Sequence, residues 1–387
     1  MRSVKLALYA GLLLFYSVNY AQESENKLEN LRFNGYVKFM ETITFSGYIQ
    51  VNPVDNLVHN RLNFSYNSSD KSTWVAQFRN RIFFGESVRS IPNYGNFVNE
   101  YNGVLPLEWL WVHSNELVFN TIVDRLYYEY ANEKFQLRVG RQRINWGMNT
   151  TWNPNDLFNN YNIYDFDYEE REGGDAIRIQ FFPDYLSSID FAYKFTGNWE
   201  TDVTALKYRF NKWNYDFQVL GGKFEQLIAI GTGWEGSIAT FGFKGELTYF
   251  DDYTSNNNSL SASTSLDYAF LNGFYLLGTY LYNSNGTTEV NNSILTITDV
   301  PNAANLMPAA HNIMFNGSYA FSPIINASLG TLYSFGVNSF TLFPTLNIGL
   351  ATNFDLDFIG QLFWQELPQE EFNNIGNGFF SRLKWSF

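Results

Sequence analysis

The sequence predicts an all-β protein whose strands form a transmembrane, antiparallel, up-and-down β-barrel with a polar lumen. Three observations predict this fold. The N-terminus is typical of an exported protein, apolar and polar residues alternate with period 2 through most of the chain, and long and short connections alternate between the predicted strands. Aromatic residues also make up 19% of the chain, and aromatic girdles at two membrane interfaces are one physical cause of such an excess.

The N-terminus predicts a signal peptide. Arg2 and Lys5 form a basic start, and an apolar run over 6–18 follows it. This run is shorter than the about 20 residues that a membrane-spanning helix needs. Export with cleavage after Ala21 is therefore expected, and an uncleaved anchor helix is the alternative.

The predicted domain organisation is a signal peptide over 1–21, a short periplasmic tail over 22–30 and a single barrel over 31–387. No later segment contains the about 20 consecutive apolar residues of a second helical span. Backbone polar groups find no water inside a bilayer, so a membrane protein without such helices must be a closed barrel. The tail is too short to be a plug domain, which disfavours energised uptake of large ligands.

The period-2 pattern is clearest over 72–85, where Trp74 and Phe78 fall on one face and Arg79 and Arg81 on the other. Segments of about ten residues with this alternation are typical of membrane barrels. A soluble sandwich or propeller would need another layer over its apolar face, and no helical layer is predicted. The candidate strands are 32–45, 56–66, 72–85, 119–131, 134–143, 175–182, 187–196, 201–211, 213–223, 227–236, 240–250, 259–269, 273–282, 311–321, 325–335, 339–350, 352–364 and 378–387.

The connections between these strands test the count independently. If the first strand runs outward, the three longest connections, 86–118, 144–174 and 283–310, all lie at the outer end. Outer-membrane barrels have long outer loops and short periplasmic turns in the same way. A miscount by one hairpin would keep this parity, so eighteen strands are predicted and sixteen are the alternative. Barrels of this size can hold an aqueous channel.

The C-terminus carries a family resemblance. Leu383, Trp385 and Phe387 alternate up to the last residue. This pattern resembles the final strand of outer-membrane barrels, in which a terminal aromatic residue helps the insertion machinery to recognise the chain. The resemblance implies an outer-membrane location in a Gram-negative bacterium, with Trp385 and Phe387 as the insertion signal.

A second resemblance begins at the end of the fifth predicted strand. The residues G-R-Q at 140–142, W-G at 146–147 and N-P-x-D at 153–156 are similar to a motif of porin-like outer-membrane barrels. The motif implies a porin-like family and names no substrate. Glycines allow backbone kinks, and proline with aspartate favours a turn. Arg141 and Arg143 fall on the outward parity of the strand. They are expected to lie beyond the membrane or after a bulge, and neither is assigned a pore role.

Basic residues gather on the polar faces of consecutive strands and predict an arginine-rich wall of the lumen, because pores select solutes with rings or ladders of charge. The connection 144–174 is acidic and aromatic, and long ordered connections are often functional. It is expected to fold into the barrel and narrow it, with a solvated outer cap as the alternative. The predicted pore-lining and constriction residues are Arg79, Arg81, Arg125, Glu129, Arg138, Gln142, Asp156, Asp165, Asp167 and Arg178.

Composition disfavours several function classes. The formal net charge of −13 is unsuited to nucleic acid, because phosphate contacts need Lys and Arg. The chain has no cysteine, so disulfides and thiolate metal sites are absent. Next to His59, His113 and His311 the sequence places no catalytic partner, and no enzymatic activity is predicted. No cofactor or metal is predicted, because the acidic residues of 144–174 lack the spacing of a calcium loop.

The sequence therefore predicts an outer-membrane channel for passive diffusion of small polar solutes, with anions first because of the arginine wall. Two alternatives stay open: a non-conducting barrel that is a subunit or scaffold of a larger outer-membrane assembly, and an outer-membrane hydrolase. The expected partners are outer-membrane lipid, the barrel-insertion machinery and a small solute. A second copy of the chain or other outer-membrane proteins are further candidates.

Overall fold

The computed structural model describes most of the chain. The described residues are 30–45, 53–99, 103–159, 162–165, 167, 171–252, 258–290, 302–367 and 371–387. The predicted signal peptide over 1–21 and almost all of the predicted tail over 22–30 lie outside them. Within the described ranges, no helix combines the length and the apolar character needed to cross a membrane.

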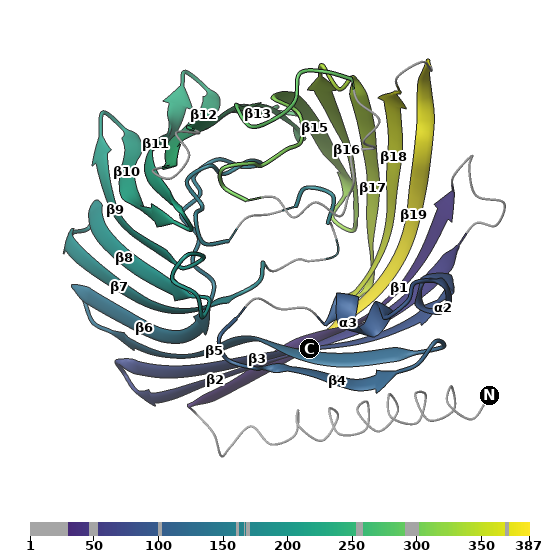
Figure 1. The fold of residues 1–387 in the computed structure, drawn as a ribbon, viewed down its shortest axis with the longest axis horizontal. Coiled ribbons are helices and arrows are strands. Elements are labelled where there is room, and N and C mark those ends of the chain that lie inside the picture. The colour runs from purple at the N-terminus through teal and green to yellow at the C-terminus, as the bar shows by residue number, and fades with distance from the viewer. Residues whose placement is uncertain are drawn as a thin grey trace.

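The described residues form one antiparallel sheet of nineteen strands. Eighteen of them close into a barrel, because the last strand pairs with the first (Figure 1). The predicted fold class and the count of eighteen are confirmed. In chain order the elements are β1 (Leu31–Phe45), β2 (Val54–Ser69), β3 (Ser72–Gly85), α2 (Glu86–Ser90), α3 (Tyr94–Val98), β4 (Glu108–His113), β5 (Val118–Ala131), β6 (Phe135–Gln142), β7 (Gly174–Asp184), β8 (Ser187–Phe195), β9 (Val203–Lys212), β10 (Tyr215–Phe224), β11 (Leu227–Ile238), β12 (Phe241–Asp252), β13 (Ser259–Ala269), β14 (Phe274–Asn283), β15 (His311–Ser322), β16 (Ile325–Phe335), β17 (Ser339–Ala351), β18 (Phe354–Glu366) and β19 (Phe372–Ser386).

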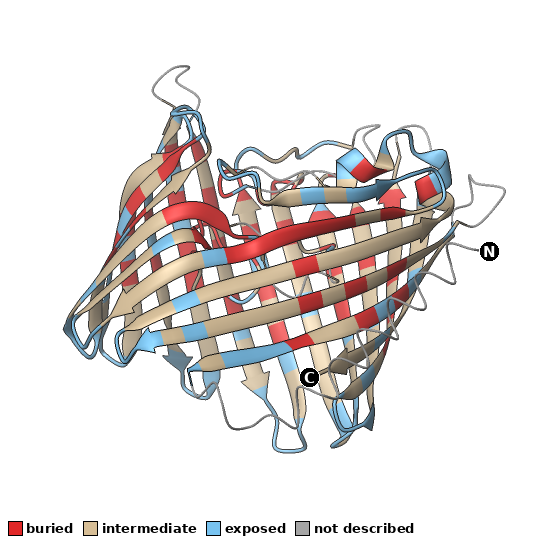
Figure 2. Ribbon diagram, turned by 90° about the horizontal axis from the view of Figure 1, so that it is seen from below, coloured by how far each residue is buried: buried red, intermediate tan, exposed pale blue. Residues whose placement is uncertain are grey.

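Alternation along the strands gives the barrel two different faces. Large apolar side chains are exposed on the outer wall, among them Trp74, Ile230 and Phe379. An apolar outer band suits the hydrocarbon of a bilayer. The opposite parity carries polar side chains, and Arg61 of β2 pairs with Arg79 of β3 in the ladder. Buried residues gather toward the end with the long connections, while the rim with the short turns is mostly exposed or partly exposed (Figure 2).

The C-terminal strand seals the barrel. Phe387 and Gly35 exchange two backbone hydrogen bonds of 2.9 and 3.0 Å. Trp385 pairs with Val37 of β1, and its ring stacks on Phe354 with 6.1 Å between the centroids. The two residues predicted as the insertion signal therefore lie where the last strand meets the first.

The structure also contains β4, a strand that was not predicted and that lies within the connection 86–118. β4 pairs with the first part of β5, residues 118–122, at the end with the long connections. β6 pairs only with the last part of β5, residues 126–131, at the end with the short turns. β4 is therefore the strand beyond the eighteen of the barrel, and it extends the wall beyond the end of β6.

Arg141 fills the junction between β4, β5, β6 and β7. Its side chain is fully buried, and its guanidinium contacts Asp175 Oδ1 at 2.9 Å and Glu108 Oε1 at 2.7 Å. It also donates to the carbonyl oxygen of Leu105 at 2.6 Å. In the ladder Arg141 pairs with Leu126, whose side chain is exposed. This position agrees with the outward parity that the sequence predicted for Arg141. The segment that leads into β4, which includes Leu105, covers the guanidinium.

Candidate functional site

The connection between β6 and β7, residues 143–173, is here called the crossing loop. Its described residues, 143–159, 162–165, 167 and 171–173, lie inside the barrel (Figure 1). Its first part packs Trp146 and Leu157 into an apolar cluster with the wall. Its later part reaches the far wall, where the carbonyl oxygen of Tyr164 accepts a 2.8 Å hydrogen bond from Gln361 Nε2 of β18. Asp167 then forms a 2.8 Å ion pair with Lys38 of β1. The loop thus connects opposite sides of the ring of strands.

Small inward-facing residues make room for the crossing loop on the wall from β8 to β13. A side chain at Gly231 would collide with the loop, because an added Cβ would lie 2.6 Å from Asn155 Oδ1. An added Cβ at Gly233 would lie 2.9 Å from Asn155 Nδ2. Other small and buried residues on these strands are Ala192, Ala205, Ala229, Ser261, Ser263 and Ser265. On β11 and β13 small residues recur at alternate positions (229, 231 and 233; 261, 263 and 265), and this spacing is a sequence signal for an occupied interior.

Glu246 of β12 is the main anchor of the loop on this wall. Its carboxylate is almost fully buried and accepts backbone N–H groups from Met148, Asn149 (2.6 Å) and Asn155 (2.9 Å). The side chain of Asn155 completes the contact, because it donates to the carbonyl oxygen of Thr232 at 3.0 Å. Hydrogen bonds to a charged acceptor are stronger than neutral ones. A lone acidic residue on a strand gave no sequence signal for this role.

Trp146 of the W-G motif is the second anchor. Its indole Nε1 donates to Asp190 Oδ2 at 3.0 Å, and its carbonyl oxygen accepts from Gln218 Nε2 at 2.8 Å. Lys207 Nζ lies 5.0 Å from the ring centroid, within the range of a cation–π contact. The motif that resembles porin-like barrels therefore supplies residues that fix the crossing loop to the wall.

Two predicted acidic residues of the loop have opposite electrostatic environments. Burial raises the pKa of Asp156 to about 6, although Arg171 opposes the shift from 2.9 Å. Burial would also raise the pKa of Asp167, but the hydrogen bond with His59 and the charge of Lys38 outweigh it and lower the pKa to about 2. Asp167 therefore stays ionised at neutral and mildly acidic pH, whereas Asp156 titrates in that range. The third, Asp165, is exposed.

Acidification is expected to tighten the crossing loop through Asp156. The pKa of about 6 lies above the ordinary value of 3.8, so the docked loop binds a proton more strongly than the released loop does. This contribution to docking is complete below pH 3.8 and is lost as the pH rises through about 6. Current noise from loop excursions in a planar bilayer should therefore fall between about pH 7.5 and about pH 5.

Asp156→Asn is the matched variant for this prediction, because it keeps the shape and removes the titration. It should weaken the pH dependence, and the remainder reports other groups that hold the loop, such as Glu246. Noise that rises on acidification, or that falls equally in Asp156→Asn, would contradict the assignment.

Beside the loop lies a cavity of about 400 Å³ with a strongly basic lining. Three of the predicted arginines meet there, Arg125, Arg138 and Arg178. Arg143, to which the sequence assigned no pore role, joins them because the chain leaves the strand after Gln142 and parity no longer sets its direction. The remaining lining residues are Gln77, Tyr127 and Asn145. Among the described residues, no carboxylate lines this cavity.

Arg138 and Arg178 have carboxylate partners outside the lining. Arg138 Nε donates to Glu129 Oε2 at 2.8 Å, and Arg178 Nε donates to Asp190 Oδ1 at 3.0 Å. Arg125 instead donates to two backbone carbonyl oxygens, that of Asp124 at 2.8 Å and that of Arg171. Carbonyl partners hold the guanidinium in place without cancelling its charge.

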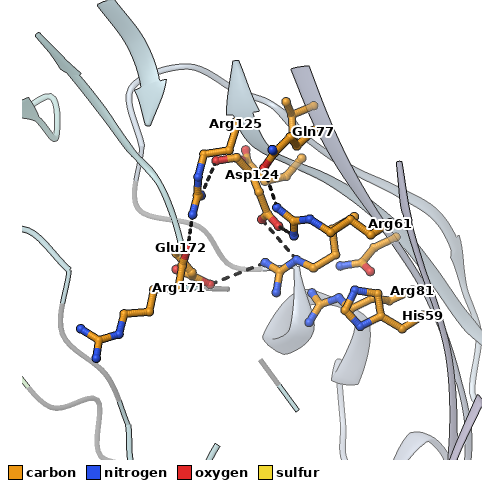
Figure 3. A network of polar contacts seen from close by, with 12 residues as sticks. His59, Arg61, Gln77, Arg81, Asp124, Arg125, Arg171 and Glu172 are labelled. Carbon is orange, nitrogen blue, oxygen red and sulfur yellow. Dashed lines mark hydrogen bonds and ion pairs between the residues drawn. The ribbon is translucent and has the colours of Figure 1, made fainter. Parts of the chain in front are cut away.

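A second basic cluster surrounds Asp124 of β5 (Figure 3). Arg61 NH1 lies 2.6 Å and Arg79 Nε 3.3 Å from its carboxylate, and Arg79 NH2 lies 3.6 Å from Glu172 of the crossing loop. Arg81 donates to the carbonyl oxygen of Val98 in α3. The structure thus places Arg79 and Arg81 at contacts between the wall and the loops, outside the lining of the 400 Å³ cavity.

Several residues have surroundings that differ from those expected from the sequence. Gln142 is fully buried, and its Nε2 donates to the carbonyl oxygen of Ala176 at 3.0 Å. His59, for which the sequence gave no acidic partner, lies with Nδ1 3.8 Å from Asp167 Oδ2. The barrel also brings Arg382 of β19 to within 3.6 Å of Asp167. Sequence reasoning missed these contacts because they join strands to a loop far away in the chain.

No protein-family model and no curated protein sequence matches the chain. Among solved structures it is similar to OccK11 (OpdR) of Pseudomonas aeruginosa, with a TM-score of 0.58, 11% identity, and coverage of 93% of this chain and 96% of that one. It is also similar to OccAB4 of Acinetobacter baumannii (TM-score 0.57, 11% identity, 94% and 100% covered) and to the outer membrane protein OprD of Pseudomonas aeruginosa (0.57, 9%, 94% and 95%). The chain therefore has the fold of these outer-membrane porins, a closed antiparallel β-barrel of eighteen strands.

Proposed function

We propose that this protein is a channel for passive diffusion of small polar solutes across the outer membrane, with a preference for anions. The observation that carries the proposal is the 400 Å³ cavity, whose lining in the described part of the chain includes Arg125, Arg138, Arg143 and Arg178 and no carboxylate. Arginine stays charged at all accessible pH values and presents a planar fork that fits carboxylate and phosphate groups.

The electrostatic balance of this region favours anions. Asp124, the carboxylate next in sequence to Arg125, is already paired with Arg61 and Arg79. Within the described residues, Arg125 therefore has no carboxylate to itself, because it shares Asp124 with these two arginines. A cleft lined by one sign of charge, with walls of low dielectric, concentrates ions of the opposite sign.

The crossing loop supports the proposal as a constriction. It spans the interior from the wall that carries Glu246 to the wall that carries Lys38. Solutes that pass through the barrel would move alongside the loop, next to the arginine-lined cavity. In this proposal, the residues of the loop set the size limit and the arginines set the charge preference.

The test is conductance of the purified protein in a planar bilayer, with ion selectivity taken from the reversal potential in a salt gradient. Stable openings with anion preference are expected for the natural sequence. Arg125→Gln/Arg143→Gln removes two charges from the cavity and should move the reversal potential most of the way to that of a non-selective pore. Arg89→Gln is the control, because Arg89 lies on α2 with its side chain 63% exposed.

Three outcomes would count against the proposal. A folded barrel that never conducts would favour the scaffold function. A cation preference, or an anion preference that survives Arg125→Gln/Arg143→Gln, would show that the arginine-lined cavity does not select the solute.

A further inference from the structure

A second cavity of about 290 Å³ lies between the crossing loop and the wall formed by β14, β15, β17 and β18. The loop contributes Thr150, Thr151 and Ile163 to it. It shares no lining residue with the arginine-lined cavity, whose loop residues are Arg143 and Asn145. The crossing loop therefore borders two cavities with different linings.

The described residues that line the second cavity include no ionisable side chain. Its apolar surface comes from Leu277, Met314, Phe343 and Ile359 of the wall together with Ile163 of the loop. An ion in such a site would lose hydration without gaining a countercharge, which is costly. The lining therefore disfavours the anions that the arginine-lined cavity attracts.

Polar groups with unused hydrogen-bonding capacity complete the lining. The side chains of Asn316 and Thr345 make no hydrogen bond within the described residues. Gln361 donates through Nε2 to the carbonyl oxygen of Tyr164, and its amide oxygen has no partner within the same part of the chain. Amides and hydroxyls together offer both donors and acceptors. A ligand with several hydroxyl groups could pair with all three side chains.

We propose that this cavity binds an uncharged, polyhydroxylated solute of monosaccharide size, a pentose or a hexose. The C–H face of a sugar ring fits the apolar surface around Phe343, and its hydroxyls match Asn316, Thr345 and Gln361. The cavity volume of about 290 Å³ lies just below the about 300–1,000 Å³ that is typical of small-molecule sites. Neutral solutes then have a site of their own, which is independent of the anion preference proposed above.

The test is saturation-transfer NMR on the detergent-solubilised full chain with xylose and glucose as probes. Saturation transfer from the natural protein to at least one sugar is expected, and added sulfate should not displace it. Asn316→Leu and Thr345→Val keep the side-chain volume but each remove hydrogen-bonding groups. Each should weaken sugar binding by about fivefold, the effect of a typical hydrogen bond.

Two controls separate this site from the arginine-lined cavity and from misfolding. Arg125→Gln should leave sugar binding unchanged, and so should Asn326→Leu, which changes an exposed asparagine at the start of β16. The inference is wrong if neither sugar receives saturation from the natural protein, or if Asn316→Leu and Thr345→Val bind as the natural protein does. Loss of sugar binding in Arg125→Gln would also overturn it. The anion proposal is tested separately by the reversal potential. Its failure can therefore be distinguished from a failure of the sugar site, which is tested by NMR.

Discussion

Glu246→Leu is expected to release the crossing loop from the wall and to raise the single-channel conductance severalfold. The carboxylate of Glu246 accepts backbone N–H groups from Met148, Asn149 and Asn155, and leucine accepts none. Losing these three hydrogen bonds should cost about 3 kcal/mol of docking free energy, a shift of roughly a hundredfold in the docked-to-released ratio. The measurement is conductance in a planar bilayer, together with proteolysis of the exposed loop.

Two further variants separate loop release from a simple change of charge. Glu235→Gln removes a carboxylate from β11 that is paired with Lys244 at 2.7 Å, and it should leave the conductance close to that of the natural protein. Gly231→Val should reproduce the effect of Glu246→Leu without any change of charge, because its Cβ would displace Asn155. If Glu246→Leu conducts like the natural protein while its loop becomes sensitive to protease, the loop does not limit the pore.

Arg141→Met is expected to destabilise the barrel more than any other single exchange at its rim. Methionine keeps much of the volume but leaves the carboxylates of Glu108 and Asp175 without the cation that lies 2.7 and 2.9 Å from them. Removing one partner of a buried ion pair costs about 3–5 kcal/mol. The free energy of urea unfolding of the barrel in lipid vesicles should fall by that amount, with β4 detaching first.

Arg89→Met is the matched control for this exchange. Its partner Glu86 lies 3.6 Å away, and both side chains are largely exposed. Exposed ion pairs contribute about 0–1 kcal/mol, so little change is expected. Arg141→Lys should fall between the two, because lysine keeps the charge but cannot reach all the partners of a guanidinium fork. Equal unfolding midpoints for Arg141→Met and the natural protein would show that β4 does not depend on this junction.

Strand positions were predictable wherever apolar and polar residues alternate without interruption. The predicted strand 72–85 coincides with β3, 259–269 with β13 and 325–335 with β16. The last strand begins at Phe372, before the predicted 378, because asparagines and glycine weaken the pattern at its start. β4 was not predicted because a strand of six residues contains too few alternations of apolar and polar side chains to show a period of 2.

Parity also predicted on which face of their strands three of the cavity's arginines lie, while their role in a pore stays a prediction. Arg125, Arg138 and Arg178 were assigned to the polar faces of their strands, and the structure brings them to one cavity. Arg143 lies beyond the end of β6, where parity has no meaning. The backbone at Gly140, with φ of 118°, marks the departure from regular strand geometry just before it.

The sequence by itself determined the all-β barrel, its strand count and the faces of its strands, because these depend on side-chain alternation between neighbouring residues and on connection length. Only the tertiary structure decided where the crossing loop is attached and which cavities it borders. The contacts of Glu246 with Asn155, of Lys38 with Asp167 and of Gln361 with Tyr164 join residues far apart in the chain. No local sequence pattern predicts such contacts, because they form only when the strands have closed into a barrel with the loop inside it.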